Sequence, residues 1–189
     1  MLVRDVRECL PRGWADDIKQ VSWQFGRELA LTGDDPTSRH IDDRNGKSVY
    51  RVTTYGDIVE RLPWLDDLYF GAFHDAALEV DDQARCLDDD SAININECSP
   101  GCGYEWHVDP NSPTGLLFVT ADTTGRFLMQ LRDYELDVQP IPGLLLMFDA
   151  RQAPHCVLPA SGLRISVPMV YLGAGQERSA DNDYLYGSD

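Results

Sequence analysis

The feature that most constrains the fold is a series of short apolar segments, separated by turn-forming residues, that fills the second half of the chain. About eight such segments follow one another at roughly ten-residue spacing. Turn sequences such as Ser-Pro-Gly, Thr-Thr-Gly and Pro-Ile-Pro-Gly lie between them. Short strands in regular succession are typical of a sandwich or barrel. The expected strands are Ala92–Cys98, Tyr104–Val108, Gly115–Ala121, Arg126–Leu131, Tyr134–Val138, Leu144–Phe148, Pro154–Leu158 and Leu163–Leu172.

The first half of the chain has helical rather than strand periodicity. We expect one helix from Trp14 to Leu31, ending at Gly33, and a second from about Trp64 to Val80. Between them, Thr32–Lys47 is rich in turn formers and predicts a loop, and Ser48–Tyr55 predicts a strand. The second helix should pack one apolar face on a sheet, because its apolar residues recur at three- and four-residue steps: Leu65, Leu68, Tyr69, Ala72, Phe73, Ala76 and Val80.

Length and composition favour one globular domain. The chain has 189 residues, and no linker rich in proline, glycine or serine divides it. We therefore predict a single domain, 1–189, mainly β with flanking helices. Residues 1–91 would form a helical support and lid region, 92–172 the β core, and 173–189 an acidic tail.

Charge and hydropathy exclude several classes of partner. The net charge of −16 disfavours nucleic acid, because such proteins need a basic surface for the phosphates, whereas a cationic or zwitterionic small substrate is compatible with it. No apolar run is long enough to cross a membrane, and no secretory signal begins the chain, so we expect a cytoplasmic protein. The five scattered cysteines do not indicate a disulfide framework, and Cys98 and Cys102 lack a second pair that would complete a zinc site.

Three potential metal ligands recur in the strand region. His107 and Asp109 are two residues apart, and alternate side chains of a strand share one face. His155 follows Asp109 after 45 intervening residues, on another expected strand. Two histidines and one carboxylate on one side of an ion leave positions open for a cosubstrate and dioxygen, as in iron(II) oxygenases. We therefore predict His107, Asp109 and His155 as the ligands of a catalytic Fe(II) that uses O2.

Arg164 and Ser166 indicate an anion-binding function beside that metal. They lie two residues apart in the last expected strand, and eight residues separate His155 from Arg164. The planar guanidinium group binds a carboxylate through two parallel hydrogen bonds, and the serine hydroxyl can donate a third. The sequence therefore predicts a site for a carboxylate-bearing cosubstrate.

From Ile93 to Leu172 the sequence resembles the 2-oxoglutarate and iron(II)-dependent dioxygenases, above all their prolyl 4-hydroxylase-like branch. The resemblance lies in ININECSPGCGYEWHVD, in TTGRFLMQL and in VQPIPGLLLMFDARQAPHCVLPASGLRISVPMVYL. It implies a double-stranded β-helix (jelly roll) core, with the N-terminal helices packed outside its larger sheet. It also implies 2-oxoglutarate as cosubstrate, with Arg164 binding its C5-carboxylate, and ascorbate as a reductant. Asn96 or Tyr104 would be a second cosubstrate contact.

The sequence departs from the pattern of that branch at two points. Many prolyl hydroxylases have lysine where Arg164 stands, and the tyrosine that several of them carry on the strand before the His-x-Asp pair is not evident. Asp109 is present, whereas the halogenating relatives lack that carboxylate.

The expected function is hydroxylation of an unactivated C–H bond in a small molecule, an amino acid or secondary metabolite, with release of succinate and CO2. Only Thr32–Tyr55 is available to build a peptide groove, although hydroxylation of peptidyl or protein residues remains an alternative. A cupin-like dioxygenase that does not use 2-oxoglutarate, and a non-catalytic jelly-roll binding module, are alternatives of other classes. Trp106, Arg126 and Arg151 are weaker candidates for the pocket lining, since strand aromatics commonly fill cores. The oligomeric state is not predicted.

Overall fold

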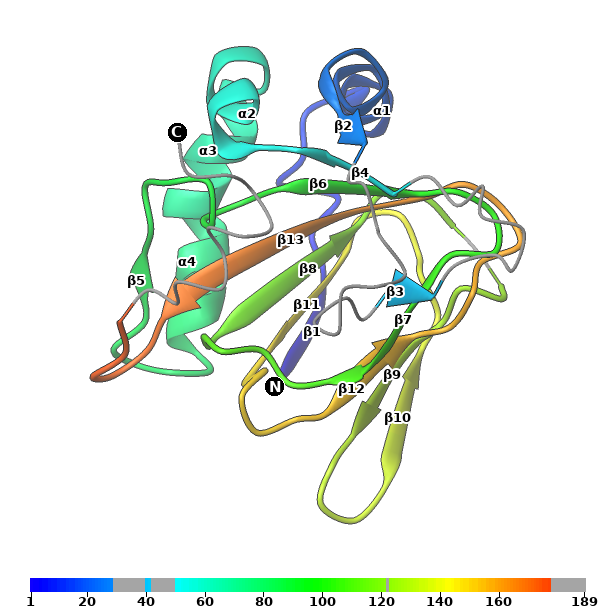
Figure 1. The fold of residues 1–189 in the computed structure, drawn as a ribbon. Helices are drawn as coiled ribbons and strands as arrows, with labels where there is room; N and C mark the ends of the chain where they lie inside the picture. Colours follow the sequence, from blue (N-terminus) through cyan, green and yellow to red (C-terminus); the bar gives the residue numbers. More distant parts are fainter. Residues whose placement is uncertain (29–39, 42–49, 122, 178–189) are drawn as a thin grey trace.

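A computed structural model of the chain describes residues 1–28, 40–41, 50–121 and 123–177. Two antiparallel sheets face each other and form a jelly roll, with helices outside the larger sheet (Figure 1). The helices are α1 (Trp14–Phe25), α2 (Tyr55–Arg61), α3 (Pro63–Phe70) and α4 (Ala72–Leu78). The strands are β1 (Leu2–Asp5), β2 (Arg27–Glu28), β3 (His40–Ile41), β4 (Tyr50–Thr53), β5 (Arg85–Cys86), β6 (Ile95–Cys98), β7 (Gly103–His107), β8 (Thr114–Phe118), β9 (Phe127–Gln130), β10 (Glu135–Val138), β11 (Leu144–Phe148), β12 (His155–Val157) and β13 (Arg164–Leu172).

The larger sheet has the order β1-β11-β8-β13-β6-β4-β2, with β5 paired to β13, and the smaller has the order β10-β9-β12-β7-β3. Each of the eight strands expected in the second half is present. The mainly β fold with a jelly-roll core is therefore confirmed. The first half also contributes strands to this core, because β1, β2 and β4 belong to the larger sheet and β3 to the smaller.

Alternation along the strands of the larger sheet separates two cores. One set of apolar side chains packs against the helices, and includes Ile95, Leu117, Leu145, Met147, Ile165, Val167, Met169 and Tyr171. The alternate residues of β8 and β11 face the smaller sheet, and form a second cluster that includes Phe118, Phe127, Met129, Leu146 and Phe148. Successive side chains of a strand point to opposite faces of the sheet. On β6 and β13, the residues next in sequence to those that face the helices therefore face the interior of the roll. Those neighbours include Asn96, Cys98, Arg164 and Ser166.

The helices depart from the sequence prediction in three places. The second expected helix is divided at Gly71 into α3 and α4: this glycine has φ −106° and ψ −109°, and a Cβ there would lie 2.9 Å from the Asp67 carbonyl oxygen. Most of its predicted apolar face is nevertheless buried against the sheet, whereas Leu68 and Val80 are partly buried and Ala72 is exposed. The first helix ends at Phe25 rather than Leu31, and residues 29–39 lie outside the described residues. Tyr55 begins α2 and does not end a strand.

Arg51 on β4 explains the early end of α1. Its guanidinium donates hydrogen bonds to the carbonyls of Trp23 and Gly26, at 3.1 and 2.7 Å. These bonds satisfy carbonyl groups that a continuing helix would have used, and the chain turns into β2, which pairs with β4.

Neither β1 nor α2 was predicted from the sequence. In the described residues no helix combines the length and apolar character needed to cross a membrane.

Candidate metal centre and anion anchor

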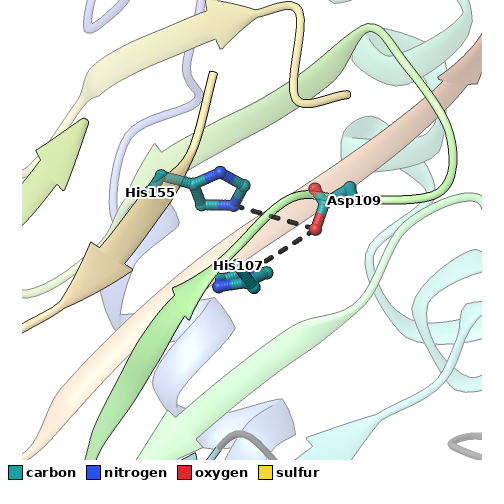
Figure 2. A group of neighbouring side chains, drawn as sticks. All are labelled: His107, Asp109 and His155. Atoms are coloured by element: carbon teal, nitrogen blue, oxygen red, sulfur yellow. Dashed lines mark ion pairs between the residues drawn. The ribbon is translucent and has the colours of Figure 1, made fainter. Parts of the chain in front are cut away.

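His107 and His155 come together because two strands pair in register. His107 ends β7, His155 begins β12, and the two residues are direct partners in the smaller sheet. Asp109 lies in the loop after β7, where its backbone N–H donates to the Ala150 carbonyl at 3.0 Å. Figure 2 shows the three side chains directed toward one another. The residues predicted as metal ligands are therefore adjacent in space.

The three side chains offer a compact set of donor atoms. The Nε2 atoms of His107 and His155 lie 3.4 and 3.7 Å from Asp109 Oδ1 (Figure 2). One ligand atom from each residue falls within 4.8 Å of the others, a spacing that a single cation can bridge. The histidine side chains are 9 % and 6 % exposed and the aspartate 26 %, so the set is open to solvent mainly on the carboxylate side.

Backbone carbonyls orient both imidazole rings. His107 Nδ1 lies 2.7 Å from the Glu105 carbonyl oxygen, and His155 Nδ1 lies 2.9 Å from that of Ala153. A carbonyl only accepts, so each Nδ1 must carry the proton and donate it. The neutral ring then has its lone pair on Nε2, the atom that faces Asp109. In this tautomer the Nε2 lone pair of each ring is available to coordinate a metal ion.

Asp109 is held as a carboxylate. Burial acts to raise its pKa, but the hydrogen bond and charge of His107 and the charge of His155, which both rings supply when protonated, together with the hydrogen bond from Thr114 outweigh burial, so that its pKa lies below the usual value. The Thr114 hydroxyl donates to Oδ2 at 3.1 Å. This bond leaves Oδ1 directed toward the two histidines.

Aromatic rings surround the histidines. The Phe127 and Phe148 rings lie 5.5 and 5.0 Å from that of His155, between centroids. The Tyr104 ring lies 4.4 Å from that of His107. Tyr104 reaches this position through a β-bulge, since three residue steps on β7 oppose two on β12. The bulge places residues 104 and 107 side by side, a contact that strict alternation would not predict.

Arg164 is a buried cation without an ionic partner among the described residues. It is only 6 % exposed, and none of the ion pairs in this part of the chain includes it. Its Nη2 donates to Cys98 Sγ at 3.1 Å, while its Nη1 is buried with no hydrogen-bond partner in the described structure. Burying an uncompensated charge costs several kcal/mol. The geometry therefore predicts an anionic ligand for this guanidinium.

Ser166 and Asn96 flank Arg164 on the same wall. They are register partners on β13 and β6, beside the pair formed by Arg164 and Cys98. Ser166 is buried, and Asn96 Oδ1 is buried without a hydrogen-bond partner in the described residues. The wall therefore carries several polar groups that a polar ligand could satisfy. This juxtaposition of Arg164, Ser166 and Asn96 agrees with their predicted roles, which stay predictions.

Solved structures of similar fold identify the architecture. A prolyl-4-hydroxylase from Pseudomonas putida matches with a TM-score of 0.56 and 20 % identity over 92 % of each chain. A Trichoplax adhaerens prolyl hydroxylase, in complex with a hypoxia inducible factor peptide fragment, matches with a TM-score of 0.64 and 14 % identity over 99 % of this chain and 87 % of that one. A 2OG-Fe(II) oxygenase family oxidoreductase from Burkholderia pseudomallei matches with a TM-score of 0.66 and 11 % identity over 93 % and 88 %.

The chain has the fold of the 2-oxoglutarate and iron(II)-dependent oxygenases. No family model and no curated protein matches the sequence itself. Within this oxygenase fold, the residues present fit both groups that such a protein would bind. Two Nε2 lone pairs and a carboxylate suit a divalent metal, and the unpaired, buried Nη1 of Arg164 suits a carboxylate.

The remaining predicted pocket residues are not brought to this centre by any contact in the described residues. Trp106 is 48 % exposed and therefore does not fill the core, contrary to the expectation for a strand aromatic. Arg126 pairs with Asp137 on the surface, and Arg151 is exposed. The candidate lid comprises Thr32–Lys47 with the expected Val49–Tyr55 strand. The backbone of His40–Ile41 pairs with β7 beside Tyr104, and Tyr50–Thr53 forms β4 of the larger sheet; residues 32–39 and 42–49 lie outside the described residues.

Proposed function

We propose that this protein is a 2-oxoglutarate-dependent iron(II) oxygenase that hydroxylates an unactivated C–H bond. The observation that carries the proposal is the convergence of His107, Asp109 and His155, with both Nε2 atoms directed at one carboxylate oxygen. In the proposal these three residues bind Fe(II). Arg164, with Ser166 and Asn96, binds the distal carboxylate of 2-oxoglutarate.

Iron(II) bound there, with 2-oxoglutarate and O2, would supply the oxidising power for C–H hydroxylation, with release of succinate and CO2. The residues of this chain supply orientation and charge. The Glu105 and Ala153 carbonyls keep Nδ1 of each histidine protonated and Nε2 free, and Thr114 orients Asp109. Arg164 provides the positive charge that selects a dicarboxylate cosubstrate.

Phe127 and Phe148 close the apolar side of the centre. Their rings pack on His155, and they belong to the cluster between the two sheets. Water is thereby excluded from the side of the metal centre that faces the core, which strengthens the electrostatic interactions around it.

For the substrate we propose a small molecule, an amino acid or a secondary metabolite. The support is the net charge of −16, which is compatible with a cationic or zwitterionic ligand. A peptidyl hydroxylase is the second candidate. The similarity in fold to a prolyl hydroxylase crystallised with a peptide favours it.

The test measures succinate formed from 2-oxoglutarate by the purified protein with Fe(II), O2 and ascorbate. Free amino acids and proline-containing peptides are supplied in parallel, and hydroxylated product is detected by mass spectrometry. Succinate production that depends on iron and rises with one substrate class would support the proposal and decide between the two candidates. A protein that binds no stoichiometric iron and consumes no 2-oxoglutarate would refute it.

A further inference from the structure

The thiol of Cys98 occupies one edge of the Arg164 guanidinium. Cys98 on β6 and Arg164 on β13 are direct register partners in the larger sheet, with both side chains on the inner face. Arg164 Nη2 donates to Cys98 Sγ at 3.1 Å, and the two residues are 2 % and 6 % exposed. Directly opposite residues on one face of an antiparallel pair have their Cβ atoms about 5 Å apart, so the strand register itself creates this contact.

The hydrogen-bond acceptor of Arg164 is unusual for a chain so rich in carboxylates. The sequence contains 32 aspartate and glutamate residues, yet the group that accepts from the buried arginine is a neutral sulfur. Burial is the main cause that raises the pKa of Cys98, so the thiol keeps its proton at neutral pH. The guanidinium therefore has a hydrogen-bond partner at Nη2 while its charge remains uncompensated.

A small cluster on the inner face holds the thiol in place. Cys98 lies between β13 and β4, opposite Tyr50, and packs with Tyr50, Val52 and Cys102. All three neighbours are buried. Cys98 therefore contacts the Arg164 guanidinium through its sulfur while the residue belongs to a buried, mainly apolar cluster.

We propose that Cys98 is a positioning residue for the cosubstrate: its thiol fixes one edge of the Arg164 guanidinium without neutralising it, so that Nη1 stays available to the distal carboxylate of 2-oxoglutarate. This inference rests on the proposed function. An apolar residue at position 98 would leave Nη2 unpaired and the guanidinium free to reorient. A carboxylate at that position would pair with Arg164 and compete directly with the ligand.

The test compares Cys98→Ser, Cys98→Ala and Cys98→Asp, with Val52→Ala as the control for lost packing in the same cluster. The Kd of 2-oxoglutarate is measured by calorimetry on each protein loaded with Mn(II), and kcat is measured at saturating 2-oxoglutarate. We expect Cys98→Ala to raise the Kd about tenfold, since a hydrogen bond to a charged group is lost, with little change in kcat. Cys98→Ser should stay within about threefold of wild type, and Cys98→Asp should raise the Kd more than Cys98→Ala does.

Val52→Ala should lower the melting temperature without raising the Kd. Equal Kd values for wild type, Cys98→Ala and Cys98→Asp, all folded and loaded with Mn(II), would overturn the inference. So would a Cys98→Ala defect that Val52→Ala reproduces, because packing would then be its cause. The proposed function fails separately, when wild type binds no 2-oxoglutarate or Arg164→Met binds it equally well.

Discussion

Replacing Arg164 by methionine should stabilise the ligand-free protein and at the same time weaken its binding of 2-oxoglutarate. The two effects have one cause, because the buried guanidinium has no ionic partner in the described structure until an anion binds. Methionine retains a long apolar stem and removes the charge. Replacing buried ionic groups by apolar ones of similar volume has stabilised proteins by about 1–4 kcal/mol.

The magnitude follows from the contacts of Arg164. The substitution gives up one hydrogen bond to the neutral Cys98 thiol, which offsets about 1 kcal/mol of that gain. A net gain of about 1 kcal/mol raises the melting temperature of a protein of this size by about 2–4 °C. Loss of the charge-assisted contact to a carboxylate costs about 2–5 kcal/mol, which corresponds to at least a 30-fold weaker affinity.

The assay is thermal unfolding of both proteins with Mn(II), in the absence and presence of 2-oxoglutarate. At 100 times the wild-type Kd a ligand stabilises wild type by about 2.7 kcal/mol, whereas a variant whose Kd is about 30-fold higher gains only about 0.9 kcal/mol, so the ligand-induced shift of the variant should be about a third of that of wild type or less. The order of the two melting temperatures should therefore reverse when the ligand is added. Arg126→Met is the matched control: it breaks an exposed ion pair with Asp137, worth at most about 1 kcal/mol, and should leave the ligand-induced shift intact.

A variant that melts well below wild type without ligand, yet shows the same ligand-induced shift, would contradict the reasoning. In that case Arg164 would serve the fold and not the cosubstrate.

Three further predictions concern the metal centre and the fold. His107→Ala, Asp109→Ala and His155→Ala should each abolish stoichiometric iron binding and turnover, measured by metal analysis and succinate release; substantial activity in any of them would reject the proposed ligand set. Thr114→Val should weaken metal affinity about 10- to 100-fold with the fold retained, because Asp109 Oδ2 loses its donor; a metal titration that matches wild type would exclude this role. Tyr69→Phe should cost about 1–3 kcal/mol in chemical denaturation, since the buried hydroxyl donates to the Val170 carbonyl at 2.7 Å and accepts from Leu87 N–H at 2.8 Å; an unchanged midpoint would show that water replaces both bonds.

Elements with a strong local pattern could be predicted from the sequence. Each of the eight strands in the second half follows from alternating or apolar runs bounded by turn residues, and the helical apolar face that contains Leu65, Tyr69 and Phe73 follows from its periodicity. The spacing of His107 and Asp109 marked both as candidate ligands, but Asp109 lies in the loop after β7 and not on the strand. Its position depends on the hydrogen bond from its backbone N–H to the distant Ala150 carbonyl, which strand alternation does not predict.

Features that depend on a distant partner could not be predicted. The early end of α1 requires Arg51, which lies 25 residues beyond Gly26. Tyr104 contacts His107 only because a bulge in β7 opposes β12. The break at Gly71 is a local feature, but in the sequence only the glycine itself indicates it. The apolar periodicity on both sides of Gly71 favoured one continuous helix instead.

The sequence alone determined which residues could bind a metal and an anion, since side-chain chemistry and strand periodicity are local properties. Only the tertiary structure decided that His155 lies beside His107, and that a thiol, not a carboxylate, meets the Arg164 guanidinium. Both contacts arise from the register between strands far apart in the chain. The hydrophobic pattern of each strand decides which of its faces is buried, but which residues become partners depends on both strands together, so neither segment alone fixes the register.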